Sequence, residues 1–423
     1  MKPLVQVSAT DVPALAAAFR VALDGGPAVW PVPSPLRGEE PAKRASRSPY
    51  APVGLETDGL HPPRPAEVGD GVALVVETSG STDAPKRVLL SRDALRAAAA
   101  ATEAALSGPG QWLLALPAHY IAGAQVLVRS ILAGTDPVLL EAEPEGSGGG
   151  FQPAAFAAAS ARLDRHRPRY TSLVPVQLAR LVEAAQTDRV VADALRTFDR
   201  ILLGGQAAPP ALIVAADAIG ARVTRTYGSS ETAGGCVYDG RPLDDVRVRI
   251  DDAWSGPGRD GQVLLGGPMI ADGYLDDPER TAAAFTEDDA GTRWYRTGDL
   301  GELRRDGILR IRGRMDDVII SGGVKVVLGE VERAVRRVPG YEHAIAVRTE
   351  DTEWGERVAV VAERTDAAAS GDLETLAAAA DAAGLSPAAR PVRLELVDRM
   401  PLLPSGKPDR RALEGRLRGG GPA

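Results

Sequence analysis

The sequence is sparing in cysteine, in basic charge and in long apolar runs. Cys236 is its single cysteine, which excludes an intrachain disulfide framework and fits a reducing cytoplasm. Basic residues number 49 against 57 acidic ones, which argues against general nucleic-acid binding because that function shows a basic excess. No apolar run reaches the length of a membrane span, and the N-terminus lacks the order of a signal peptide. These absences predict a cytoplasmic protein with no membrane span and no nucleic-acid partner.

What the sequence does contain is an alternation of strand and helix patterns. Residues 33–70 are rich in Pro, Arg and Glu and predict mostly loop. Elsewhere in the first half we expect helices over 11–23, 91–106, 120–133 and 174–185, and strands over 71–78, 111–117, 200–205 and 221–228. Ser91 is the expected N-cap of the second helix. Strands that alternate with helices indicate a mainly parallel α/β sheet covered on both faces.

Beyond about residue 237 the pattern changes to short strands and turns, which predicts an antiparallel β subdomain. The segment GRMDDVIISGG (313–323) carries paired acids and glycines and is the expected hinge. Helical and strand patterns then alternate to the end, as in a small α+β domain. The predicted division is a large domain over 1–313 and a small one over 314–423.

A hydroxyl-rich stretch with a lysine follows the strand that ends near Thr78. Small residues let backbone N–H groups approach an anion, hydroxyls add donors, and a lysine adds positive charge. The spacing is not that of a Walker A loop, which needs G-x-x-x-x-G-K-[ST]. For TSGST alone, a flexible polar turn is an equally good interpretation. The predicted phosphate-binding residues are Thr78, Ser79, Gly80, Ser81, Thr82 and Lys86.

Two further stretches place polar groups after strands, where open α/β sheets bind ligands. In LLGGQ the residues Gly205 and Gln206 can pack along a flat ring, although an ordinary tight turn explains them in isolation. In TYGSSET, Tyr227 offers a stacking face beside Gly228, and Ser230 offers a hydroxyl. Glu231, a carboxylate beside a polyphosphate, makes sense chiefly with Mg²⁺ between them, and a solvated Glu is the alternative.

The last two stretches lie towards the C-terminus. Asp299, in YRTGDLGEL, is a carboxylate on a tight turn and can accept both hydroxyls of a ribose. Lys407, in LPSGKPDRRAL, lies on an expected turn far from the other motifs. In isolation, a turn-forming Asp and a surface lysine explain both.

Taken together and in this order, the stretches TSGST…PK, ALPAHY, GGQ, YGSSET, TGD, GRMDDVIISGG and PSGK resemble one family. The chain from about residue 72 onward is similar to the adenylate-forming superfamily of acyl-CoA synthetases, non-ribosomal adenylation domains and luciferases. The resemblance implies an α/β fold. It has a large N-terminal domain of mixed sheets with helices and a distorted β-barrel, and a small mobile α+β C-terminal domain.

The resemblance also implies the reaction. A carboxylate would attack ATP to give an acyl-adenylate and pyrophosphate, with positioning and charge stabilisation as the main protein contributions. The residues 78–82 and Lys86 would cradle the β- and γ-phosphates. The other implied roles are Mg²⁺ binding by Glu231, α-phosphate contact by Ser230, adenine contact by Gly205, Gln206, Tyr227 and Gly228, ribose binding by Asp299 with Arg314, and bridging of the carboxylate and α-phosphate by Lys407.

In the family's second half-reaction a thiol attacks the adenylate and AMP leaves. By resemblance, the small domain would rotate about Asp316, and Gly322 and Gly323 would line a channel for the pantetheine of coenzyme A. His119 is similar to the aromatic gate of that channel, although a His at an apolar helix start is more often a packed residue. The chain departs from the family loop TSGSTG-x-PKG, because Asp83 and Arg87 replace two glycines.

The stretches LVPVQLARL and TYGSSETAGGCVYDG resemble the o-succinylbenzoate–CoA ligases of menaquinone biosynthesis. The implied partners are this small carboxylic acid, ATP and coenzyme A, and a homo-oligomer stays open. Ser172, Gln177 and the loop around Gly234 are the expected acyl pocket, with Cys236 as a packing residue. Alternatives are another aryl- or acyl-CoA ligase, a stand-alone carrier-loading adenylation enzyme, and a non-catalytic nucleotide-binding protein. An amino-acid loader would need a pocket carboxylate, and none is evident between 119 and 236.

Overall fold

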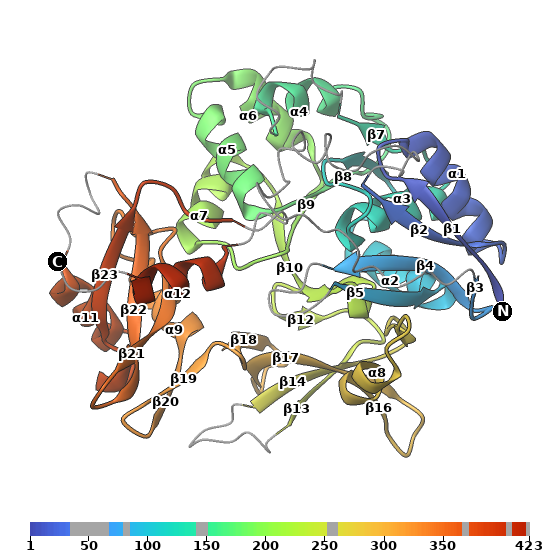
Figure 1. The fold of residues 1–423 in the computed structure, drawn as a ribbon. Helices are drawn as coiled ribbons and strands as arrows, with labels where there is room; N and C mark the ends of the chain where they lie inside the picture. Colours follow the sequence, from blue (N-terminus) through green and yellow to red (C-terminus); the bar gives the residue numbers. More distant parts are fainter. Residues whose placement is uncertain are drawn as a thin grey trace, which may run out of the picture. The chain divides into compact units, whose positions relative to one another are not determined.

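The computed structural model describes residues 1–33, 67–78, 85–140, 151–251, 261–365, 372–402 and 408–419. It is an α/β protein with several sheets (Figure 1), as the sequence predicts. The chain forms two compact units, the first made of Met1–Val248 with Leu265–Tyr295 and the second of Arg249–Leu264 with Arg296–Ala423. The expected functional boundary at residue 313 stays a prediction. Within the described residues, no helix has the length and apolar character needed to cross a membrane.

A seven-stranded sheet forms the centre of the first unit, in the order β12-β11-β10-β9-β8-β6-β7. Its strands are β6 (Gln111–Leu114), β7 (Val138–Leu139), β8 (Arg169–Leu173), β9 (Arg200–Leu203), β10 (Val223–Ser229), β11 (Gly234–Tyr238) and β12 (Arg241–Pro242). The strands from β7 to β10 run parallel, while β11 and β12 are antiparallel additions. The carboxyl ends of β8, β9 and β10 therefore meet at one edge of the sheet.

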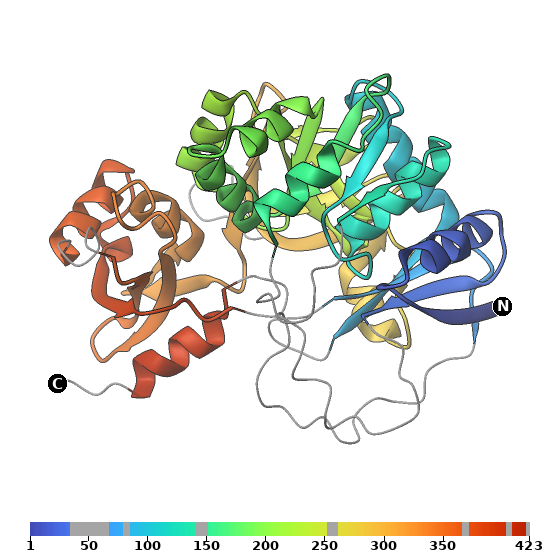
Figure 2. The same cartoon turned by 90° about the horizontal axis from the view of Figure 1, so that it is seen from above.

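Helices cover both faces of this sheet, as predicted. The helices α4 (Pro153–Ser160), α5 (Pro175–Ala185), α6 (Arg189–Thr197) and α7 (Pro210–Ile219) gather together in the 153–219 segment, drawn in green (Figure 2). Their apolar side chains, including Phe156 and Leu195, pack on Leu113, Ile201 and Leu203 of the sheet. On the other face Arg129 of α3 (Ile121–Leu132) lies 5.0 Å from the Trp112 ring of β6.

A second sheet of the first unit has the order β15-β5-β4-β2-β1-β3. Its strands are β1 (Lys2–Ser8), β2 (Ala28–Val32), β3 (Glu67–Val68), β4 (Val72–Thr78), β5 (Lys86–Ser91) and β15 (Gly273–Tyr274). Helix α1 (Val12–Leu23) joins β1 to β2, and α2 (Arg92–Ala105) follows β5 with Ser91 as its N-cap, accepting from the Ala94 N–H at 3.1 Å. Both helices were predicted, whereas β1 and β2 were not expected. Pro31 makes the sequence of β2 an unfavourable one for a strand. In the structure, however, Pro31 lies opposite Val7 in the parallel pair of β2 and β1.

The second unit contains a small antiparallel sheet and a C-terminal α+β region, as the sequence predicts. In the first of these, β18 (Leu309–Arg314) pairs with residues 299–303 of β17 (Arg293–Leu303), and β13 (Arg247–Asp251) and β14 (Gly261–Gly266) extend the sheet. The C-terminal sheet has the order β20-β19-β22-β21, with β23 beside β22. Its elements are β19 (Val318–Ser321), β20 (Val324–Val327), α9 (Leu328–Val335), β21 (Ile345–Asp351), β22 (Gly355–Glu363), α11 (Leu373–Ala382), β23 (Pro391–Val397) and α12 (Arg410–Gly419).

Candidate active site

The motif TYGSSET ends β10 and forms a short 3₁₀ turn over Ser230–Thr232. The backbone of Gly228 lies so close to that of Gly234 that a Cβ on Gly228 would be 2.2 Å from the Gly234 carbonyl oxygen. The turn therefore requires a residue without a side chain at position 228. The Thr232 hydroxyl accepts a hydrogen bond from the Ser229 N–H at 2.9 Å and donates to Gly234 O at 2.7 Å. From α3, Gln125 donates to the Ala233 carbonyl at 2.7 Å. These bonds fix the backbone that carries Ser230 and Glu231.

Glu231 is a buried carboxylate, with 5 % of its surface exposed. Its Oε1 atom accepts a hydrogen bond from the hydroxyl of Tyr274 at 2.9 Å. No ion pair involves Glu231 among the residues that the structure describes. Tyr274 therefore supplies the hydrogen bond that offsets the burial of this charge.

Tyr274 connects Glu231 to the strand that carries Lys86. It lies on β15, which pairs antiparallel with β5 so that Tyr274 is opposite Val88. The Nζ atom of Lys86 lies 5.7 Å from the centre of the Tyr274 ring, within the range of a cation–π interaction. Burial, and then the neighbouring Glu231 charge, raise the pKa of the Tyr274 hydroxyl, so this group stays neutral. Tyr274 is not expected from the sequence, since only the pairing of β15 with β5 brings it to this place.

The motif expected to bind phosphate is flanked by two antiparallel strands. Thr78 ends β4 and pairs with Lys86, which begins β5, and its hydroxyl lies 3.5 Å from the Lys86 carbonyl oxygen. A strand therefore follows the motif here, whereas a helix follows a Walker A motif. Ser79, Gly80, Ser81, Thr82 and Asp83 lie outside the described residues.

The residues expected around the adenine follow neighbouring strands. Gly205, with φ of 85°, and the exposed Gln206 come directly after β9. Tyr227 is half-buried near the end of β10, opposite Val237. Because β9 and β10 are parallel and pair Leu203 with Arg225, the segments that follow them share one edge of the sheet.

The residues expected at the acyl pocket lie in the same unit. His119 precedes α3, and burial lowers the pKa of its imidazole to about 4, so the ring is neutral near pH 7. Ser172, on β8, is 7 % exposed, and its hydroxyl has no hydrogen-bond partner within the described part of the chain. Gln177 differs, since it accepts from the Val174 N–H at 3.1 Å and donates to Ala115 O at 2.9 Å. Both ends of that amide thus bind the main chain at the start of α5.

In the second unit, Arg314 joins two carboxylates. Its Nη1 atom lies 3.3 Å from Asp299 Oδ1, and its Nε donates to Asp316 Oδ1 at 3.1 Å. Asp299 is held in place because its N–H donates to the Thr297 hydroxyl at 3.0 Å. Gly322 and Gly323 form the turn between β19 and β20, with φ of 54° and 80°. Lys407 lies outside the described residues.

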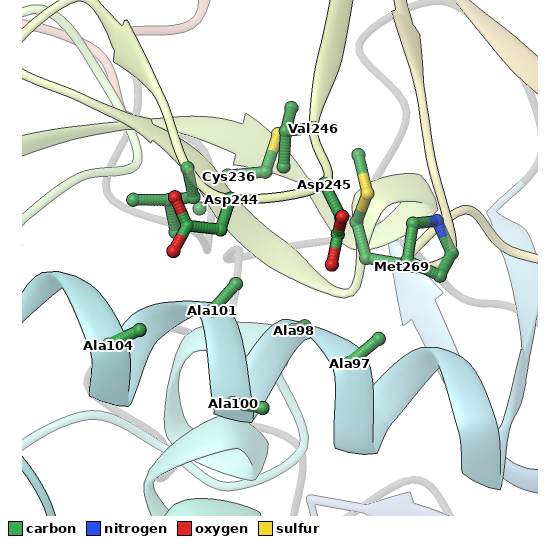
Figure 3. Close-up of a pocket in the computed structure, with 13 residues that line it drawn as sticks. Ala97, Ala98, Ala100, Ala101, Ala104, Cys236, Asp244, Asp245, Val246 and Met269 are labelled. Atoms are coloured by element: carbon green, nitrogen blue, oxygen red, sulfur yellow. The ribbon is translucent and has the colours of Figure 1, made fainter.

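A cavity of about 250 Å³ lies elsewhere in the first unit (Figure 3). Alanine side chains of α2, among them Ala97 and Ala101, face Asp244, Asp245 and Met269 across it. Cys236 contributes a buried thiol. Gly235 and Cys236, from the loop expected at the acyl pocket, line this cavity, whereas none of the residues expected to hold the nucleotide does.

Comparison with known proteins identifies the family of this chain. Residues 11–275 match the family model of AMP-binding enzymes, and the chain belongs to this family. It is similar to the probable 2-succinylbenzoate–CoA ligase of Mycobacterium tuberculosis (strain ATCC 25618 / H37Rv), with 40 % identity over 355 residues, covering 84 % of this chain and 86 % of the relative. The 2-succinylbenzoate–CoA ligase of Bacillus subtilis (strain 168) is 29 % identical, and there the match spans 68 % of this chain and 58 % of the relative.

Two solved structures are also similar. The o-succinylbenzoate CoA synthetase of Bacillus subtilis, in complex with its acyl-adenylate intermediate, has a TM-score of 0.67 and 26 % identity, covering 81 % of this chain and 69 % of its own. The amide bond synthetase McbA from Marinactinospora thermotolerans has a TM-score of 0.71 and 28 % identity, covering 98 % and 80 %. The family resemblance drawn from the ordered motifs is thereby confirmed.

Proposed function

We propose that this chain is an AMP-forming acid–CoA ligase that converts 2-succinylbenzoate to its CoA thioester, a step of menaquinone biosynthesis. The observation that carries the proposal is the 40 % identity to the M. tuberculosis relative over most of both chains. The buried pair of Glu231 and Tyr274, beside Lys86, supports it from the geometry, because ATP chemistry needs a metal-binding carboxylate near a phosphate-binding cation.

In the first half-reaction, an oxygen of the substrate carboxylate attacks the α-phosphorus of ATP. The bond from that phosphorus to the β-phosphate breaks, and pyrophosphate leaves. Lys86 and the 78–82 loop would hold the β- and γ-phosphates, and the Ser230 hydroxyl would donate to the α-phosphate. Lys407 would draw the attacking carboxylate and the α-phosphate together. Stabilisation of charge in this way supplies most of the acceleration in phosphoryl chemistry.

The donor set around Glu231 fits Mg²⁺. One carboxylate oxygen is bound by Tyr274, while Oε2 has no partner within the described residues. Mg²⁺ is usually held by one or two carboxylates together with substrate phosphates and water. Groups of three or more His, Cys, Asp or Glu that could hold a metal alone are absent from the described ranges, consistent with a metal that arrives with the nucleotide. When bound, Mg²⁺ would neutralise charge on the phosphates.

The nucleoside would be held by two sets of groups. Gly205, Gln206, Tyr227 and Gly228 would flank the adenine at the edge of the central sheet. Asp299 would accept the ribose hydroxyls, and Arg314, which already binds Asp299, would keep that carboxylate oriented. An aspartate held by an arginine and a backbone bond is a preorganised acceptor.

In the second half-reaction, the sulfur of coenzyme A attacks the acyl carbon, and AMP leaves. Asp316 would serve as the hinge, and Gly322 and Gly323 would line the path of the pantetheine arm. His119 would gate that path as a neutral ring, in keeping with its lowered pKa. The Ser172 hydroxyl, which has no hydrogen-bond partner within the described residues, would bind the second carboxylate of the acid together with the Gly234 loop. Gln177 would reach the acid only by giving up a main-chain bond.

The test is ATP–pyrophosphate exchange with a panel of carboxylic acids, followed by addition of coenzyme A. We expect exchange with 2-succinylbenzoate well above other aryl acids, and AMP release on adding the thiol. Exchange with amino acids, or with none of the acids, would contradict the proposal. The match to the amide bond synthetase McbA covers 98 % of this chain. A parallel reaction therefore offers a simple amine in place of coenzyme A. Lys407→Ala should lose exchange yet still form thioester from supplied acyl-adenylate.

A further inference from the structure

We infer that Tyr274 is a positioning residue that presents Glu231 to the metal with its hydroxyl and supports Lys86 with its ring. The inference rests on the proposed function, because it takes Glu231 as the metal ligand and Lys86 as a phosphate ligand. Tyr274 belongs to none of the motifs TSGST…PK, ALPAHY, GGQ, YGSSET, TGD, GRMDDVIISGG and PSGK.

The segment that carries Tyr274 is bound to both elements that it would position. The Ala271 N–H donates to the Glu231 carbonyl at 2.9 Å. On the other side, the Asp272 and Leu275 N–H groups donate to the carbonyls of Leu89 and Arg87 on β5, at 2.9 and 2.8 Å. The backbone from 271 to 275 is therefore a bridge between the Glu231 turn and the Lys86 strand.

Additional contacts hold this bridge in place. Arg293 donates to the Ala271 carbonyl at 2.9 Å through Nε and to the Asp272 carbonyl at 2.6 Å through Nη2. The Tyr274 N–H donates to the Thr281 hydroxyl at 2.9 Å, and its ring packs against Phe285 with centres 5.5 Å apart. Tyr274 is 5 % exposed. These contacts and this burial restrict the movement of its side chain.

The hydroxyl has a specific effect on Glu231. A hydrogen bond to Oε1 fixes the rotation of the carboxylate and leaves Oε2 for the metal. Groups that hydrogen-bond to a metal-binding side chain and orient it typically contribute about 10- to 100-fold to metal affinity. The ring acts separately, because its face attracts the Lys86 ammonium through a cation–π interaction and needs no ion pair to do so. Removal of the hydroxyl alone should therefore separate the two effects.

The experiment compares Tyr274→Phe, Tyr274→Leu and a matched control, Tyr170→Phe. Tyr170 is also buried, and its hydroxyl donates one bond, to the Gly108 carbonyl at 2.9 Å. Binding of α,β-methylene-ATP is measured in EDTA by calorimetry. Mn²⁺ binding to the enzyme–analogue complex is then measured by electron paramagnetic resonance. Both measurements are independent of the acid, so they succeed or fail separately from the substrate assignment.

We expect Tyr274→Phe to weaken Mn²⁺ binding by about 10-fold or more while metal-free nucleotide affinity stays unchanged. Tyr274→Leu should weaken both, and Tyr170→Phe should weaken neither. In a Glu231→Gln background, Tyr274→Phe should have no further effect on Mn²⁺, which distinguishes positioning from general loosening. Unchanged Mn²⁺ affinity in Tyr274→Phe, or an equal loss in Tyr170→Phe, would overturn the inference.

Discussion

Lys86 and Arg87 are neighbours in the chain, but their side chains lie over different aromatic rings. The Nζ of Lys86 is 5.7 Å from the Tyr274 ring centre, whereas the Arg87 guanidinium is 4.9 Å from that of Trp30 and 3.6 Å from Glu77. Successive side chains of a strand point to opposite faces, and both residues are on β5. Arg87 occupies a position where the adenylate-forming family has a glycine. Its side chain therefore packs against Trp30 of β2.

The first prediction separates these two cations. Lys86→Ala should lower the rate of adenylation by about 10²-fold or more, because a phosphate-stabilising charge is removed. Arg87→Ala should leave adenylation nearly unchanged and cost about 1 kcal/mol of stability, since it loses a cation–π contact and a weak ion pair. Pyrophosphate exchange and urea unfolding of both variants measure the two effects. Equal rate losses would show that Arg87 also serves the nucleotide.

The second prediction concerns Gly228, whose neighbour Gly234 approaches it closely. Gly228→Ala places a methyl group against the Gly234 carbonyl oxygen, and relief of the clash should cost about 1–3 kcal/mol of stability. Adenylation should fall as well, because the shift moves the turn that carries Glu231. Gly71→Ala is the control, since its added Cβ would meet nothing within 4 Å. If the two variants unfold at the same urea concentration, the close approach is not required.

The third prediction is a pH dependence of stability due to His119. Burial lowers its pKa to about 4 from the ordinary 6.5, so between these values the unfolded chain binds a proton that the folded chain excludes. The contribution of His119 to the free energy of unfolding is therefore lost as the pH falls through this window. Urea unfolding at neutral pH and at about pH 5 should show a smaller loss for His119→Gln than for the wild type. An identical loss in both proteins would mean that the imidazole titrates normally.

The fourth prediction concerns the thiol of Cys236. It is 2 % exposed, and burial raises its pKa to about 12, so the reactive thiolate is scarce. The folded protein should not react with Ellman's reagent at about pH 8, whereas the denatured chain should release one equivalent of chromophore. Cys236→Ala should retain adenylation, as expected of a packing residue. Rapid labelling of the folded chain would instead indicate an accessible thiol.

The sequence predicts the local features of this molecule well and the long-range ones less well. The N-cap at Ser91, the helix α1 and the strand–turn pattern around Glu231 depend on residues close in the chain, so periodicity and motif spacing reveal them. Tyr274 depends on the pairing of β15 with β5, and β2 depends on two parallel neighbours that tolerate Pro31. No local pattern encodes such register. The same holds for Gln177, whose amide is occupied by main-chain groups far away at Ala115.

The pairing of Thr78 with Lys86 has a consequence for what sets the position of the lysine. The two residues lie opposite each other in the antiparallel pair of β4 and β5, so this pairing fixes the separation of their backbones. Lys86 therefore takes its place from the strand ladder, which continues through Val88 and Leu89 opposite Val76 and Val75. A change in that ladder would displace the cation even where the letters of the motif stay the same.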